Sequence, residues 1–149
     1  MAGYSSTPLL QKLGIKNGSR VLLRNAPAAF PRELEEFSEA RPRKHLNVVV
    51  LFADSADELF AELKHFESVI EPDGMIWVAW PKKASGVKTD ITEGVIRDYA
   101  LKTHLVDVKV CAIDETWSGL KLVVRKEYRA ALAARPERKS IVDFRTQET

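Results

Sequence analysis

The sequence contains a single cysteine, Cys111, and three histidines that share no spacing typical of metal ligands. A lone cysteine cannot form an internal disulfide, and without a second thiol or a paired histidine the chain lacks the usual ligands of a zinc site. Cys111 lies within the strand-like segment "VKVCAI", where we expect a small buried thiol. The sequence therefore predicts neither a disulfide nor a metal site.

The sequence also has no long apolar run. No segment approaches the roughly 18 to 20 apolar residues that a membrane-spanning helix needs, and the opening "MAGYSSTPLL" lacks the basic and apolar regions of a secretory signal. These two absences predict a cytoplasmic protein that has no membrane partner.

Charge of one sign is not in excess, because 23 lysines and arginines face 21 aspartates and glutamates, for a net charge of +2. Such a balance gives no field that attracts nucleic acid, so we expect no nucleic-acid partner. Residues 125–139 form the most basic stretch, and a solvated helix face is the favoured interpretation. The alternative is nucleic-acid binding through Arg125, Lys126, Arg129 and Arg135.

The chain is long enough for one hydrophobic core, since 149 residues with 45% hydrophobic content match an ordinary single domain. We expect this domain to cover residues 1–135 and a polar, mobile tail to cover residues 136–149. Residues 47–53 and 75–80 are apolar without alternation, which is typical of parallel strands buried on both faces. Residues 20–24 ("RVLLR") are predicted to form the first strand, launched by a turn at Asn17 and Gly18.

Two later segments, residues 106–113 and 120–125, alternate between apolar and polar positions. The segment "DETWSG" between them predicts a turn of about six residues, and hence an antiparallel hairpin.

Helix signals separate the strands. Ser55 and Glu58 form a capping box that opens one helix, "EPDG" ends it, and Asp90 is expected to cap the next helix. Because helices between parallel strands cover the sheet, we predict an α/β three-layer sandwich, mostly parallel and Rossmann-like, with a terminal antiparallel hairpin. The other predicted helices run from Pro8 to Gly14, over residues 31–39 and over residues 126–134.

This order of elements resembles the class I methyltransferase fold in a shortened form. "LGIKNGSRVLL" resembles the lead-in to the first strand of that fold, and "IEPDGMIWVAW" resembles its fifth strand. More specifically, "YSSTPLLQKLGIK", "WVAWPKKASGVKTD" and "KVCAIDETWSGLKLVVR" resemble an uncharacterised bacterial family of small methyltransferase-like proteins with "WPKKASG" and "DETWSG" signatures.

The resemblance to methyltransferases implies S-adenosylmethionine as a cofactor, held by a glycine-rich turn after the first strand. Here "RNAPAAF" follows that strand, with no glycine and with Pro27, which has no N–H. The acidic residue that holds the cofactor ribose in those enzymes has no counterpart closer than Glu39, because only 22 residues separate the first two strands. We therefore expect no cofactor, with S-adenosylmethionine in a rearranged loop as the alternative.

Ligands of parallel α/β sheets bind beyond the carboxyl ends of the strands. "PKKASG" and "DETWSG" both fall at that edge of the predicted sheet, so we expect these two loops to meet. We predict no catalytic residue. The candidate ligand-binding residues are Trp80, Lys82, Lys83, Ser85, Gly86, Asp114, Glu115, Trp117 and Ser118.

Two interpretations of these loops stay open. In the functional one, Lys82, Lys83 and the start of the following helix hold a phosphate or carboxylate. In the structural one, the two lysines pair with Asp114 or Glu115 while the indole of Trp117 packs on the sheet.

The sequence thus leaves two hypotheses of function. The first is a non-catalytic module that binds a small anionic ligand or a protein partner at the carboxyl-end edge. The second is a divergent S-adenosylmethionine-dependent methyltransferase with a rearranged cofactor loop, in which Asp54 or Glu115 orients the substrate. We favour the first because the glycine turn is missing, and because Ser85 has no histidine in its loop to activate it as a nucleophile. The oligomeric state is not predicted.

Overall fold

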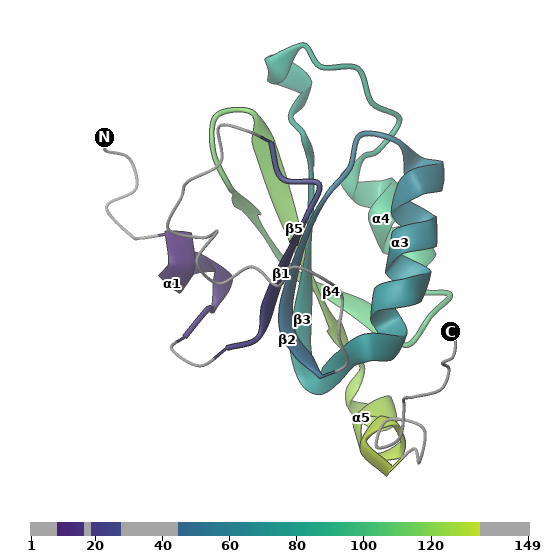
Figure 1. The fold of residues 1–149 in the computed structure, drawn as a ribbon. Helices are drawn as coiled ribbons and strands as arrows, with labels where there is room; N and C mark the ends of the chain where they lie inside the picture. The colour runs from purple at the N-terminus through teal and green to yellow at the C-terminus, as the bar shows by residue number, and fades with distance from the viewer. Residues whose placement is uncertain (1–8, 17–18, 28–44, 135–149) are drawn as a thin grey trace.

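A five-stranded mixed sheet forms the centre of the fold in the computed structural model, which describes residues 9–16, 19–27 and 45–134 (Figure 1). The predicted helix over residues 31–39 and the predicted tail over residues 136–149 lie outside the described residues. The strands are β1 (Val21–Arg24), β2 (Leu46–Phe52), β3 (Ile70–Pro81), β4 (Leu105–Ala112) and β5 (Trp117–Val124).

The strand order β1-β2-β3-β5-β4 confirms the predicted parallel sheet with a terminal antiparallel hairpin. β1, β2 and β3 pair in parallel, whereas β5 runs antiparallel to both β3 and β4. The carboxyl ends of β1, β2, β3 and β4 therefore lie at one edge of the sheet, which we call the carboxyl-end edge. β5 ends at the opposite edge, which we call the amino-end edge.

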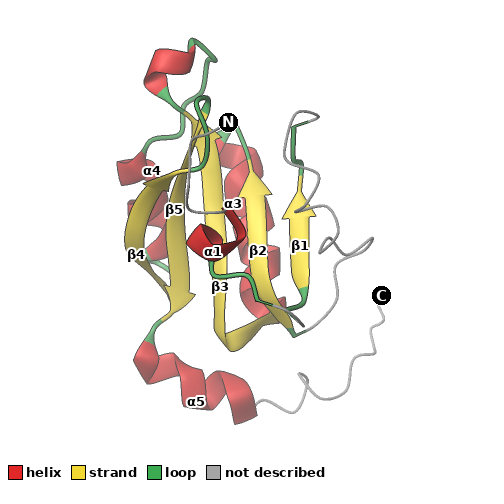
Figure 2. Cartoon of the chain, turned by 90° about the vertical axis from the view of Figure 1, so that its left-hand side faces the viewer, coloured by secondary structure: helices red, strands yellow, loops and turns green. Residues whose placement is uncertain are grey.

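Helices lie on both faces of the sheet, which confirms the three-layer arrangement (Figure 1). α3 (Ala56–Val69) and α4 (Glu93–Ala100) cover one face, and the short α1 (Leu9–Leu13) lies against the other. α5 (Lys126–Ala134), also predicted, follows β5 at the amino-end edge (Figure 2). Within the described ranges, no helix has the length and apolar character needed to cross a bilayer.

Each face of the sheet has its own buried cluster. On the α3 side, Leu59, Leu63 and Phe66 are fully buried, as their helical spacing predicted. On the α1 side, Trp77 is fully buried, and its indole N–H donates a hydrogen bond to the carbonyl oxygen of Leu13 at 3.0 Å. This bond satisfies the buried indole N–H and ties α1 to the sheet.

α3 ends at Val69, so the predicted end of this helix before "EPDG" is confirmed, but β3 begins directly after the helix and includes "EPDG", ahead of the apolar run predicted to form the strand. The extra residues are absorbed by a shift of the β2–β3 register between Leu46 and Val48. Gly74 fits this irregularity because a Cβ there would lie 2.7 Å from Cγ1 of Ile70 and 2.9 Å from the carbonyl oxygen of Asn47.

The turn of the terminal hairpin is shorter than the six residues predicted, because β5 already starts at Trp117. Trp117 pairs with Pro81, and Ser118 pairs with Trp80, in the antiparallel ladder between β3 and β5. These backbone pairs extend the strand into the segment that composition alone had assigned to a loop.

Candidate functional site

An open groove of about 880 Å³ lies at the carboxyl-end edge, between the loop that follows β2 and the long loop that follows β3. We call it the carboxyl-end groove. Its floor consists of the buried residues Trp80, Pro81 and Ile91. Its charged residues are Asp54, Lys83, Lys88, Asp90 and Glu93.

Thr89 fixes the long loop after β3 against the end of β2. Its hydroxyl donates a hydrogen bond to the carbonyl oxygen of Asp54 at 2.8 Å and accepts one from the backbone N–H of Ile91 at 3.0 Å. One side chain therefore positions both walls of the groove.

Asp90 caps a different helix from the one that the sequence predicted. Its carboxylate accepts a hydrogen bond from the N–H of Ala56 at 2.8 Å, at the start of α3. α4 begins only at Glu93, and its cap is Thr92, whose hydroxyl accepts from the N–H of Val95 at 3.1 Å. The predicted cap of α4 by Asp90 is wrong, because the loop runs beside α3 and offers Asp90 a free helix amide there.

Ser85 and Gly86, two of the candidate residues, shape the loop itself. In the 3-10 turn Lys83–Ser85, the Ser85 hydroxyl donates to the carbonyl oxygen of Lys82 at 2.6 Å and accepts from the N–H of Val87 at 3.2 Å. Gly86 ends the turn with a φ of 81°, in the left-handed region that glycine adopts at the lowest cost. Both residues thus stabilise the loop.

Asp54, Lys83 and Lys88 carry the charges of the groove that have no partner in the part of the chain that the structure describes. Among the described residues, none forms an ion pair or a hydrogen bond with these three side chains. Their charged groups are therefore available to a ligand.

Glu93, by contrast, forms an ion pair within α4, of which it is the first residue. Its carboxylate pairs with the guanidinium of Arg97, which also donates to Asp107 at 3.0 Å. The hydrogen bonds to Asp107 and to Glu93 raise the pKa of Arg97. The negative charge of Glu93 is thus largely balanced from within α4.

The two candidate tryptophans lie on opposite faces of the sheet. Trp80 is on the α3 face, is 8% exposed and forms part of the groove floor. Trp117 packs on the α1 face, in a T-shaped pair with Phe52 at a centroid distance of 5.1 Å. Because Trp117 pairs with Pro81, one position beyond Trp80, the alternation along a strand separates the two indoles. The packing expected in the structural interpretation is confirmed for Trp117.

The two loops that we expected to meet are joined by their backbones. The N–H of Lys82 donates to the carbonyl oxygen of Thr116 at 2.7 Å. In the described part of the chain, neither Lys82 nor Lys83 pairs with Asp114 or Glu115, so the ion pairs of the structural interpretation do not form. The predicted contact between the two loops is confirmed, but it is a backbone hydrogen bond in place of the expected ion pairs.

Asp114 stabilises the hairpin turn, since its carboxylate accepts from the N–H groups of Thr116 and Trp117, both at 2.8 Å. Of the candidate residues, Trp80, Lys83 and Gly86 line the carboxyl-end groove. The others lie outside its lining: Lys82, Ser85, Asp114, Glu115, Trp117 and Ser118. Ligand binding by any of the nine stays a prediction.

Two residues of interest were missed by sequence reasoning. Lys88 lines the groove together with Lys83. The signal in the sequence was the following pair, Thr89 and Asp90, whose hydrogen bonds to Asp54 and Ala56 hold this loop against the start of α3. Asn25 follows β1 with a φ of 61°, and its side chain donates to the carbonyl oxygen of Phe52 at 3.5 Å. Asparagine is among the few residues other than glycine that readily adopt this conformation.

A metal centre finds no support in this part of the chain, because the described residues contain no group of three or more His, Cys, Asp or Glu side chains that could hold an ion. Cys111 is half-buried near the end of β4. Burial raises the pKa of its thiol, while the charges of Lys12 and Lys109 lower it.

Solved structures share this architecture at low sequence identity. A pericyclic reaction enzyme aligns with 78% of this chain and 39% of its own length, at 11% identity and a TM-score of 0.50. LepI in complex with SAM aligns over the same shares at 12% identity and a TM-score of 0.49. The mitomycin 7-O-methyltransferase MmcR aligns over 70% and 41%, at 11% identity and a TM-score of 0.42. The chain therefore spans about two fifths of the length of these proteins.

The strand order β1-β2-β3-β5-β4 is that of the predicted class I methyltransferase-like α/β fold in a shortened form, and the match to the pericyclic reaction enzyme agrees with this fold. At such identities the likeness shows the fold and nothing about activity. The chain belongs to the family described as protein of unknown function DUF3052, which matches residues 34–126. No curated protein matches the sequence.

Proposed function

We propose that the protein is a non-catalytic binding module that holds a small anionic ligand in the carboxyl-end groove. The observation that carries this proposal is the pair Lys83 and Lys88, two ammonium groups without a described partner above a floor of buried apolar residues. An apolar pocket with a few convergent polar groups is the usual form of a small-molecule site. Its position also agrees with the rule that parallel sheets bind ligands at their carboxyl ends.

The charge pattern narrows the class of ligand. Asp54 is the remaining charged side chain of the groove without a described partner, and it favours a hydroxyl or amine donor. The proposed ligand is therefore a small molecule with an anionic group for the two lysines and a hydrogen-bond donor for Asp54.

A binding role, without turnover, is supported by how the short polar side chains around the groove are used. Ser55 caps α3, Thr92 caps α4, Asp90 accepts from the N–H of Ala56, and Thr89 joins two backbone segments. A nucleophile or general base needs a free lone pair directed at the substrate, whereas these four side chains hold the backbone, and the carboxylate of Asp54, which has no described partner, is assigned above to the hydrogen-bond donor of the ligand.

The test is a thermal-shift screen with phosphorylated and carboxylated metabolites, followed by NMR titration of each hit. A ligand present at 100 times its dissociation constant raises the stability by about 2.7 kcal/mol. We expect Lys83→Ala/Lys88→Ala to weaken binding about tenfold and Asp54→Asn to weaken it less. The matched control is Lys64→Ala/Lys102→Ala, which removes the same charge at the amino-end edge.

Binding that survives the Lys83→Ala/Lys88→Ala change at full strength contradicts the proposal. If no compound in the screen binds, the same edge becomes the place to search for a protein partner, which the sequence also allowed.

A divergent S-adenosylmethionine-dependent methyltransferase is the second candidate, and one observation favours it. Asn25 has the left-handed conformation directly after β1, where methyltransferases of this class place their glycine-rich turn. Calorimetry with S-adenosylmethionine and S-adenosylhomocysteine tests this candidate. Asn25→Gly should keep the affinity and Asn25→Ala should lower it, because alanine disfavours a φ of 61°. An equal affinity of the two variants for the cofactor contradicts a role for this turn.

A further inference from the structure

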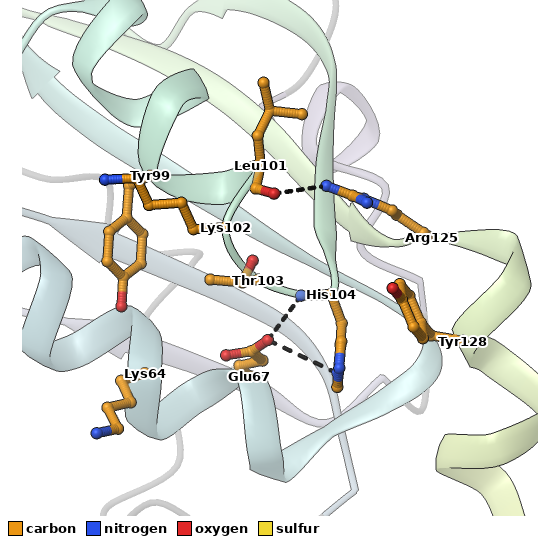
Figure 3. Close-up of a pocket in the computed structure, with 9 residues that line it drawn as sticks. All are labelled: Lys64, Glu67, Tyr99, Leu101, Lys102, Thr103, His104, Arg125 and Tyr128. Carbon is orange, nitrogen blue, oxygen red and sulfur yellow. Dashed lines mark hydrogen bonds and ion pairs between the residues drawn. The ribbon is translucent and has the colours of Figure 1, made fainter.

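A second groove, of about 530 Å³, lies at the opposite end of the sheet (Figure 3). It is formed by the last turns of α3 and α4, by the turn that leads into β4, and by the residues that join β5 to α5. We call it the amino-end groove. It shares no lining residue with the carboxyl-end groove, so the two can be altered separately.

Positive charge dominates the lining of the amino-end groove. The described lining residues include three cations, Lys64, Lys102 and Arg125, and one carboxylate, Glu67, which gives a net charge of three minus one, or +2, without counting His104. Such a surplus within one groove attracts anions and raises their local concentration.

The one carboxylate is already engaged (Figure 3). Glu67 accepts a hydrogen bond from the backbone N–H of His104 at 2.9 Å, and the same oxygen lies 3.9 Å from Nδ1 of the imidazole. Glu67 therefore fixes the turn into β4 and leaves the lysines for other partners.

Arg125 is held rigidly by neutral groups. Its guanidinium donates to the carbonyl oxygen of Leu105, the first residue of β4, at 3.2 Å. It also donates to the carbonyl oxygen of Leu101, at the carboxyl end of α4, at 3.0 Å (Figure 3). Carbonyl oxygens orient the guanidinium without cancelling its charge, which leaves a pre-positioned cation at the groove.

Lys64 and Lys102 take part in no structural ion pair within the described ranges. Among the residues that the structure describes, none forms an ion pair or a hydrogen bond with either ammonium group. In Figure 3 both lysines lie on the same side of the groove as Tyr99. Burial, and to a smaller degree the charge of Glu67, raises the pKa of Tyr99, so its phenol stays protonated and adds no negative charge.

The other side of the groove offers a flat surface. The imidazole of His104 stacks on the ring of Tyr128, with centroids 4.3 Å apart and planes inclined by 30°. The His104 side chain is 51% exposed, so part of the stacked pair faces the groove. A planar ring of a ligand can stack on such a surface.

We propose that the amino-end groove binds a phosphorylated ligand with a planar ring, the chemical class to which nucleotides belong. The phosphate is held by Lys64, Lys102 and Arg125, and the ring lies against the stacked pair of His104 and Tyr128. This site is independent of the function proposed for the carboxyl-end groove.

The experiment is an NMR titration of the full chain with three probes: adenosine monophosphate, adenosine and inorganic phosphate. We expect adenosine monophosphate to shift the backbone amides of residues 101–104 and to bind at least about fivefold more tightly than either of its parts, because both contacts then act together. Lys64→Ala/Lys102→Ala should weaken the binding reported by the amides of residues 101–104 by about fivefold or more, while Lys83→Ala/Lys88→Ala should leave the titration of these same amides unchanged, whatever binds at the other groove.

Three results overturn the proposal: equal losses in the two double variants, shifts confined to residues 83–92, or inorganic phosphate that binds as tightly as adenosine monophosphate. No binding at millimolar concentration overturns it as well. All four lysines lie on the surface away from the buried core, so both variants should fold, and thermal unfolding checks this directly. Each double variant is the control for the other groove, so a negative result at the amino-end groove does not affect the test of the carboxyl-end groove.

Discussion

The two edges of one sheet carry grooves with opposite charge balance. The amino-end groove has a net charge of +2, from three cations and one carboxylate. The carboxyl-end groove has two cations and three carboxylates, or −1, although two of its carboxylates are engaged within the protein. Topology directs ligands to the carboxyl-end edge, whereas net charge favours anions at the amino-end edge. The comparison indicates that the fold determines where a binding site can form, whereas the side chains determine which ligands it can bind.

The two edges also differ in how their loops are held. At the carboxyl-end edge, the short side chains of Thr89 and Asp90 hold backbone segments far apart in sequence. At the amino-end edge, the long side chains of Glu67 and Arg125 do so. Substitutions at the two edges should therefore lower the free energy of unfolding by different amounts, and denaturation measurements can rank them.

The largest effect is expected for glycine replacements, which act differently at the two edges. Gly74→Ala, in the irregular start of β3, should lower the free energy of unfolding by about 2 to 4 kcal/mol, because its Cβ would meet the backbone oxygen of Asn47 at 2.9 Å. Gly86→Ala should cost only about 1 kcal/mol, because it has open space and an unfavourable φ of 81°. Urea denaturation measures both.

A control within α4 separates these causes from the general effect of replacing glycine. Gly94 has only Oγ1 of Thr92 nearby, at 3.7 Å, and its φ is not in the left-handed region. Gly94→Ala should therefore stabilise the protein, by up to about 1 kcal/mol. Equal losses of unfolding free energy for Gly74→Ala and Gly86→Ala would contradict the proposal that Gly74 is required for space and Gly86 for its backbone conformation.

The next effect concerns the bond from Asp90 to the first turn of α3. Asp90→Ala should lower the free energy of unfolding by about 1 to 2 kcal/mol, the usual cost of losing a helix cap. Asp90→Asn keeps an acceptor for the N–H of Ala56 and should cost less. Asp98→Ala, at an exposed position of α4, is the control for loss of a carboxylate. A larger loss of stability for Asp98→Ala than for Asp90→Ala contradicts the cap.

Arg125 tests the amino-end edge in the same way, with a smaller expected effect. Arg125→Met keeps much of the apolar stem but leaves the carbonyl oxygens of Leu101 and Leu105 without this donor. We expect a loss of about 1 kcal/mol, since water can replace the arginine at this partly exposed site. Lys126→Met removes an equal charge next to it and should have almost no effect on the midpoint of urea denaturation.

Sequence reasoning predicted local features well and long-range contacts poorly. The apolar runs predicted β2 and half of β3, and Ser55 accepts from the N–H of Glu58 as its capping pattern predicted. The bond from Asp90 to Ala56 joins residues 34 positions apart, and no local spacing signals it. The placement of Trp117 depended on the β3–β5 register, which follows from where β5 begins.

The candidate site was predicted in outline for the same reason. Topology alone placed the loops at the carboxyl-end edge, and the structure does join Lys82 to Thr116 there. The choice of side chains failed where it relied on proximity of loops, because neighbouring strand positions point to opposite faces. The amino-end groove was missed entirely, since its residues come from three segments that are separate in sequence, 64–67, 99–104 and 125–128.

The smallest effect is expected at the carboxyl-end edge on the α1 face, where Cys111 is half-buried. Burial raises the pKa of its thiol, so the pH midpoint of its alkylation by iodoacetamide should lie above that of the urea-unfolded chain. Lys12→Ala should move this midpoint further up, because the charge of Lys12 lowers the pKa, whereas Lys16→Ala should not. Between the two pKa values the folded chain keeps a proton that the unfolded chain has released, so stability should fall as pH rises through that window. Cys111→Ser should remove this part of the pH dependence, and coincident midpoints for the folded and unfolded chains would show that the thiol is not shielded.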